Sequence, residues 1–240
     1  MAEKPRLRVW IDIDINGTRA AYQRACDFVE TRNLAYNLTS NKLEELGGSE
    51  KKRLKETLYP NDFEWKDRGR VCIRMPPERL TFELYPDVAP LAVENFISLI
   101  KGDKGKGQSG KQLHYLGCPF HRVLKGFVAQ SGDFVMGNGT GGESIYNGKK
   151  FKDDKDGLKV KLNRRGMLAM GNTGKNSNSS QFFITLSDCS RLTGKHVGFG
   201  ELVSGEEVLE LIERCGRDSD DVEDGKPLYE VVIADCGVCD

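Results

Sequence analysis

The sequence predicts a mainly β fold, an antiparallel barrel with covering helices and a long helical insertion. Between residues 119 and 203, short apolar runs alternate with Gly-rich turns, a pattern typical of antiparallel barrels. Near the N-terminus a strand reaches the turn signal Asn16-Gly17, but the return strand of this hairpin starts only near Arg79. A chain of 240 residues is long enough for one sizeable core, so we expect a single domain over residues 1–240.

The first strand and the segment after it have different periodicities. Residues 7–15 alternate apolar and polar side chains, which predicts a strand with one buried face. In the insertion, residues 18–78, an apolar stripe from Tyr22 to Val29 indicates a helix. A later helix carries Leu54 and Leu58, and we expect Pro60 to end it. Alternation at residues 71–73 predicts a short strand.

The remaining elements are bounded by clear local signals. Pro90 suits the first turn of a helix, and Gly102 can end it after Lys101. Residues 102–118 are rich in Gly and Lys and predict a mobile loop. Ser204 begins a capping-box pattern, so we expect a second helix after it, with Leu211 among its core-facing residues. A last strand is predicted over residues 229–234.

The charge composition argues against nucleic-acid and membrane partners. Lys plus Arg equals Asp plus Glu at 36 each, so neither nucleic acid nor an anionic membrane is indicated as a partner. The insertion holds 12 basic and 10 acidic residues, a net charge of +2, which also argues against a nucleic-acid arm. Its apolar stripes must bury against something, so we expect a structural brace or a surface that docks a protein partner.

The termini and the cysteines point to a reducing compartment. Residues 1–5 are charged and lack the apolar stretch of a secretory signal, and no apolar run is long enough to span a membrane. Seven cysteines is an odd number, which favours free thiols. Cys236 and Cys239 form a lone C-x-x-C without a partner pair, so we expect no metal site. We expect a cytoplasmic monomer, with the nucleus or a cilium as open alternatives.

The chemistry-bearing residues suit a neutral peptide. No G-x-S-x-G elbow, H-E-x-x-H motif or phosphate loop is present. Instead Arg122 stands among aromatic and amide side chains between residues 120 and 183. An apolar pocket with one cation and several amides fits a peptide ligand better than covalent chemistry, and no cofactor is needed.

Four blocks of sequence resemble the cyclophilin family. They are FHRVLKGFVAQSGDF (residues 120–134), NGTGGESIY (138–146), GMLAMGN with SQFFIT (166–172 and 180–185), and LTGKHVGFG (192–200). IADCG (233–237) is similar to the closing strand of the family. The resemblance covers residues 7–17 and 79–240. It implies an eight-stranded antiparallel closed barrel capped by two α-helices, with the insertion between the first two strands.

The resemblance also implies an activity and a site. Members catalyse cis-trans isomerisation of X-Pro peptide bonds in proline-containing peptides and proteins. The catalytic set that it implies is Arg122, Phe127, Gln130, Asn172, Phe183, Leu192 and His196. Within that set Gln130 would hold the arginine, while the neighbouring Phe182 should face the core because successive strand residues point to opposite faces. Further substrate contacts are implied for Val128, Gly171, Thr173, Gln181 and Arg191.

The sequence departs from the family pattern at the pocket. Val128 stands where many relatives have Met, and Arg191 where cyclosporin-sensitive members have Trp. Gly171 and Thr173 replace two alanines beside the substrate-contacting asparagine. The arginine, its glutamine and the aromatic walls remain, so we expect an active isomerase that binds cyclosporin A weakly. The alternative is a module that binds proline segments within a larger assembly and needs little turnover.

Overall fold

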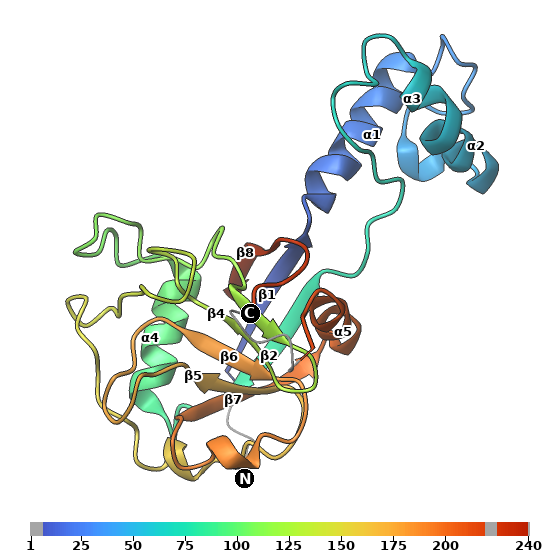
Figure 1. Ribbon diagram of the computed structural model, residues 1–240. Helices are drawn as coiled ribbons and strands as arrows, with labels where there is room; N and C mark the ends of the chain where they lie inside the picture. The colour runs from blue at the N-terminus through green and yellow to red at the C-terminus, as the bar shows by residue number, and fades with distance from the viewer. Residues whose placement is uncertain (1–6, 219–224, 240) are drawn as a thin grey trace, which may run out of the picture. The chain divides into compact units, whose positions relative to one another are not determined.

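The computed structural model describes residues 7–218 and 225–239. Eight strands form one curled antiparallel sheet in the order β3-β4-β6-β5-β7-β2-β1-β8. Figure 1 labels most of these strands. The mainly β, eight-stranded fold predicted from the sequence is confirmed. The strands are β1 (Arg8–Ile15), β2 (Arg79–Leu84), β3 (Arg122–Leu124), β4 (Val128–Ser131), β5 (Met167–Met170), β6 (Phe182–Thr185), β7 (Gly198–Ser204) and β8 (Val231–Val238).

The barrel is not closed by a continuous ladder of strands, so the expected closed barrel is overstated. The sheet begins at β3 and ends at β8, and these two edges are joined by short contacts instead of a continuous ladder. The Phe120 N–H donates to the Val231 carbonyl at 2.8 Å, and Pro119 forms an isolated bridge with Val232. We call this junction the seam, defined by residues 117–124 on one side and residues 225–233 on the other.

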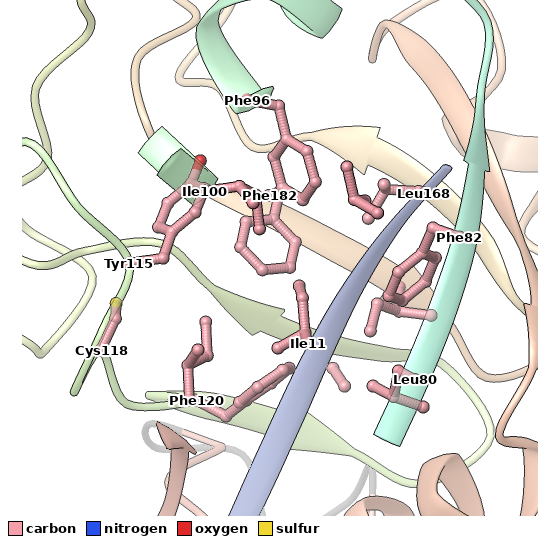
Figure 2. Packing of buried hydrophobic residues seen from close by; sticks show 14 of the residues in the cluster. Ile11, Leu80, Phe82, Phe96, Ile100, Tyr115, Cys118, Phe120, Leu168 and Phe182 are labelled. Carbon is pink, nitrogen blue, oxygen red and sulfur yellow. The ribbon is translucent and has the colours of Figure 1, made fainter. Parts of the chain in front are cut away.

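Two helices pack on the barrel core. The first, α4 (Pro90–Lys101), has the predicted bounds, and Gly102 ends it with a φ of 65°. Its Phe96 ring lies 5.1 Å from the ring of Phe182 and 5.3 Å from that of Tyr115, measured between centroids. Figure 2 shows these three rings together inside the barrel. The inward direction predicted for Phe182 is therefore confirmed.

The second helix, α5 (Glu206–Arg214), begins differently from the prediction. Ser204 is still part of β7, where it pairs with Thr81, and no side chain caps the helix. Gly205 precedes the helix with a φ of 98°, and a Cβ there would lie 2.2 Å from the Arg79 carbonyl oxygen. Since only glycine fits this close approach, strand pairing overrides the capping-box pattern. Leu209 is buried on this helix, whereas Leu211 is only half-buried.

The insertion forms a second compact unit, residues 16–76. It contains α1 (Thr18–Arg32), the 3-10 turn η1 (Leu43–Glu45), α2 (Gly48–Arg53), the π-helical turn η2 (Leu54–Leu58) and α3 (Tyr59–Asn61). Phe28 is fully buried at its centre, with the rings of Tyr36, Tyr59 and Trp65 between 5.3 and 5.7 Å away. Its apolar stripes therefore bury against one another.

Two expectations for the insertion are wrong in detail. The helix continues one residue past Pro60, to Asn61. Residues 71–73 are not a strand. The Cys72 N–H donates to the Ala21 carbonyl at 3.0 Å, so this segment is held by α1.

Other expectations concern the termini, membranes and thiols. The charged residues 1–5, on which the expected lack of a secretory signal rests, lie outside the described residues. Among the helices of residues 7–218 and 225–239, none is long and apolar enough to span a membrane. All seven cysteines are free in the structure.

Candidate active site

Four adjacent strands place the predicted site residues in one row. The register pairs Arg122 of β3 with Gln130 of β4, Gln130 with Phe183 of β6, and Phe183 with Ala169 of β5. Residues directly opposite on neighbouring antiparallel strands project to the same face of the sheet. This row therefore carries Arg122 and Phe183 on the face opposite to the core, with Gln130 between them.

An apolar cluster separate from the main core lies on this outer face. Its buried members include Val128 and Phe183, both less than 5% exposed, and Phe127 and Leu192 pack against it half-buried. A small apolar surface with an aromatic ring in its floor suits a five-membered proline ring. The structure thus brings together four of the residues expected to form the pocket wall.

His196 completes this wall as a neutral side chain. Its ring lies edge-on to Phe183 at 5.2 Å between centroids. Its Nδ1 lies 2.9 Å from the Met170 carbonyl oxygen, which can only accept, so Nδ1 carries the proton. Burial lowers the pKa of His196, which keeps the imidazole uncharged near neutral pH. The histidine is therefore a packing and positioning group in this arrangement.

The side chains of Gln130 and Gln181 form a chain of hydrogen bonds and do not hold Arg122. Gln130 donates from Nε2 to Gln181 Oε1 at 2.9 Å. Gln181 donates from its own Nε2 to the carbonyls of Gly139 and Gly141, each at 2.8 Å. These bonds fix the orientation of both amides. The expected bond from Gln130 to Arg122 is not among the contacts of the described residues.

Arg122 keeps its hydrogen-bonding capacity. No hydrogen bond or ion pair in the described part of the chain engages its guanidinium, which lies 5.9 Å from the centre of the Phe127 ring. The side chain is half-buried, and this burial lowers the pKa of Arg122 below its ordinary value. A guanidinium remains protonated in proteins, so the site presents a cation with donors free to meet a ligand.

Arg191 takes a position that the sequence did not reveal. It lies in the 3-10 turn η4 (Ser190–Leu192), and its guanidinium is 4.2 Å from the centre of the Phe127 ring. This distance is typical of a cation–π contact. Phe127 is thus approached by two guanidinium groups, and Arg191 covers apolar surface at the rim of the site.

The turn after β5 carries the remaining predicted contacts. Asn172 donates from Nδ2 to the Lys195 carbonyl at 2.9 Å, and its Oδ1 accepts from Gly174. The Gly171 N–H donates to the Gln181 carbonyl at 2.8 Å. Thr173 is exposed. Asn172 is therefore held by the backbone next to His196, while Gly171 connects its turn to the backbone of Gln181.

A buried carboxylate, missed from the sequence, organises the loop beneath Gln181. Asp133 is fully buried, and its two oxygens accept backbone N–H bonds from Val135, Met136, Asn138, Gly139 and Gly141 at 2.8–3.2 Å. The available signal was an Asp followed by a run of small and turn-forming residues. The same loop supplies the two carbonyls that Gln181 binds, so Asp133 supports the site indirectly.

A comparison with protein-family models agrees with this geometry. Residues 70–238 match the model described as cyclophilin type peptidyl-prolyl cis-trans isomerase/CLD. The chain belongs to the cyclophilin family. It is accordingly a peptidyl-prolyl cis-trans isomerase that acts on proline-containing peptides. The match spans most of the barrel of this cyclophilin, whereas β1 lies before it, on the other side of the insertion.

The Asp133 loop has a predictable response to acid. Burial raises the pKa of Asp133, but the backbone N–H donors together lower it further, so the net pKa lies below the ordinary value. A lowered folded-state pKa adds stability in full above the unfolded value of about 3.9, and that stability is lost as the pH falls through the folded value. We therefore expect the loop to stay ordered down to about pH 4 and to loosen only below it.

Amide hydrogen exchange of Gly139 and Gly141 against pH measures this response. In the Asp133→Asn variant the acid-dependent step should disappear, because no carboxylate remains to be protonated. Loosening of the parent loop between pH 7 and pH 5, or the same acid step in the variant, would contradict the assignment to Asp133.

Proposed function

We propose that Arg122 accelerates isomerisation by donating a hydrogen bond to the proline nitrogen of the twisted X-Pro amide. Resonance sets a rotational barrier of about 18–20 kcal/mol, and twisting the bond returns a lone pair to the nitrogen. A donor whose hydrogen bond is stronger in the twisted state than in the planar amide lowers the barrier to rotation. The observation that supports the proposal is a half-buried guanidinium that has no hydrogen bond or ion pair with residues 7–218 or 225–239, beside an apolar floor.

The other site residues have positioning roles in this proposal. Phe127, Val128, Phe183, Leu192 and His196 would hold the proline ring while the amide turns. Asn172 and Gln181 would bind the substrate backbone, with Gly171 and Thr173 leaving room for it. No proton is transferred and no covalent bond is broken, so a neutral His196 is compatible with the reaction.

Arg122→Ala should lower kcat/KM by about 10²–10³, because removing one donor to a transition state costs about 2.7–4 kcal/mol. The thermal midpoint should change little, since the guanidinium makes no bond to the described residues. Arg214→Ala, which removes an exposed arginine on α5, is the matched control and should keep parental turnover. Turnover of a short Ala-Pro peptide measures both. A folded Arg122→Ala protein with near-parental turnover would refute the mechanism.

We also propose that this cyclophilin binds cyclosporin A weakly because of Arg191. A tryptophan offers a flat apolar wall and one indole donor, whereas Arg191 already lies against Phe127 and carries a charge that must stay hydrated. Arg191→Trp should therefore tighten cyclosporin A binding by tenfold or more, measured by calorimetry. Parental affinity already in the nanomolar range, unchanged by the substitution, would contradict this prediction.

We further propose that the insertion docks a protein partner. Two large apolar side chains on its surface, Leu34 and Phe63, are 87% and 86% exposed. The segments that carry them are linked, because Asp62 accepts a hydrogen bond from Tyr36 at 2.8 Å and pairs with Arg32 at 3.3 Å. Apolar groups left on a unit that already has its own core favour an interaction surface over a purely structural brace.

Replacing residues 18–76 with a short Gly-containing turn should leave a folded barrel with full turnover of a small peptide. The partner, identified by cross-linking in cell extract, should be lost both in this deletion and in the Leu34→Ser/Phe63→Ser double variant. Leu116→Ser and Val203→Ser remove exposed apolar groups of the barrel and should retain it. A several-fold change in kcat/KM on deletion would show that the insertion gates the active site. A lowered melting temperature with the partner retained would show that it is a structural brace.

A further inference from the structure

The turn that carries Phe127 is held by hydrogen bonds to two other segments of the barrel. This turn connects β3 to β4. After β6, the Leu186 N–H donates to the Phe127 carbonyl at 2.8 Å, and the Ser187 hydroxyl donates to the Gly126 carbonyl. From α5, Glu213 Oε1 accepts from the Gly126 N–H at 2.8 Å. The position of Phe127 in the pocket wall therefore depends on the helix and on the segment after β6.

Arg165 is bonded to both of those segments. It precedes β5 by two residues, and its side chain is 25% exposed. Its Nη1 donates to the Leu186 carbonyl at 2.9 Å and also to Glu213 Oε2. Its Nε donates to Glu206, the first residue of α5. One guanidinium therefore connects both ends of the helix with the residue that bonds the Phe127 carbonyl.

The chemistry of these groups makes the connection stiff. Glu213 is 22% exposed, so its charge and that of Arg165 are partly removed from water, and charge-assisted hydrogen bonds are stronger there than neutral ones. A guanidinium is planar and its donors have fixed directions, so it sets the relative positions of its three acceptors. Glu213 uses one oxygen for Arg165 and the other for the Gly126 N–H. The carboxylate therefore passes the geometry of the arginine to the turn.

We propose that Arg165 is a positioning residue for the isomerase site, which acts through Glu213 and Leu186 to hold Phe127 against the proline ring of the substrate. The centre of the Phe127 ring lies 5.9 Å from the Arg122 guanidinium, so a shift of the turn changes both the width of the pocket and the distance to this cation. The inference rests on the role proposed for Phe127 in the pocket wall. It does not depend on the hydrogen bond proposed for Arg122.

Arg165→Ala in the full chain should raise KM for a short Ala-Pro peptide by about threefold to tenfold and leave kcat little changed. The reason is that the pocket wall contacts the ring in both the planar and the twisted amide, which is uniform binding. Arg165→Lys keeps the charge without the planar fork, so its KM should fall between the parent and the Ala variant. This second variant keeps the test decisive where Arg165→Ala does not fold.

Arg164→Ala is the matched control for these variants. The neighbouring Arg164 pairs with Glu201, and its side chain has no bond to the turn of Phe127 in the described part of the chain, so KM should stay parental. A merely structural role of Arg165 would lower the melting temperature and the amount of active enzyme, and with it the apparent kcat, at an unchanged KM. Parental KM in every folded Arg165 variant would therefore overturn the proposal.

Two further variants test the route and its dependence on Phe127. Glu213→Ala should also raise KM, and the rise in the Arg165→Ala/Glu213→Ala double variant should be smaller than the product of the two single effects, because bonded residues are not additive. Effects that simply multiply would overturn the route through Glu213. Phe127→Ala should raise KM more than any Arg165 variant. A parental KM in Phe127→Ala would overturn its pocket role and this inference together, whereas a raised KM there with parental values in the Arg165 variants would overturn the positioning role alone.

Discussion

The alternation of side chains across β4, β6 and β5 is the constraint on which both the core and the site depend. In β6, Phe182 points inward to Phe96 and Tyr115, and the next residue, Phe183, points outward to His196. Two consecutive residues of β6 therefore supply a core aromatic ring and the floor of the pocket. A register shift of one residue would exchange their environments, so pairing with β4 and β5 fixes the site as strictly as it fixes the fold.

Sequence patterns predicted the parts of the fold that local chemistry determines. Pro90 and Gly102 bounded α4 correctly because each restricts its own backbone, and the outward place of Phe183 follows from strand periodicity. The start of α5 was missed because the Arg79 backbone, distant in sequence, leaves room only for glycine at position 205. The Gln130–Gln181 bond was likewise missed, since amide orientation depends on carbonyls that folding brings near.

The site combines a rigid polar support with the Arg122 cation, whose guanidinium has no hydrogen bond or ion pair within the described part of the chain. Asp133 gathers five backbone donors, their loop presents two carbonyls to Gln181, and Gln181 in turn receives Gln130. Polar groups on this side are mutually satisfied, so they hold their geometry without help from substrate. Arg122 stands apart from that network at the neighbouring strand. Gln130, the other half-buried polar residue of the row, is bonded to Gln181, whereas the Arg122 donors meet no acceptor among the described residues.

The insertion alters the order in which the barrel can assemble. β1 and β2 are paired neighbours, with Arg8 opposite Glu83 and Asp12 opposite Arg79. The side-chain bond between Arg79 and Asp12 nevertheless spans 67 positions of sequence. Closing so long an unstructured loop costs conformational entropy that a tight hairpin avoids. Residues 16–76 have a core of their own, so folding of this unit ahead of the barrel would bring the two strand ends together and shorten the effective loop. The first hairpin, which in a short-turn barrel is a local contact available early, is here a contact between strands that are distant in sequence.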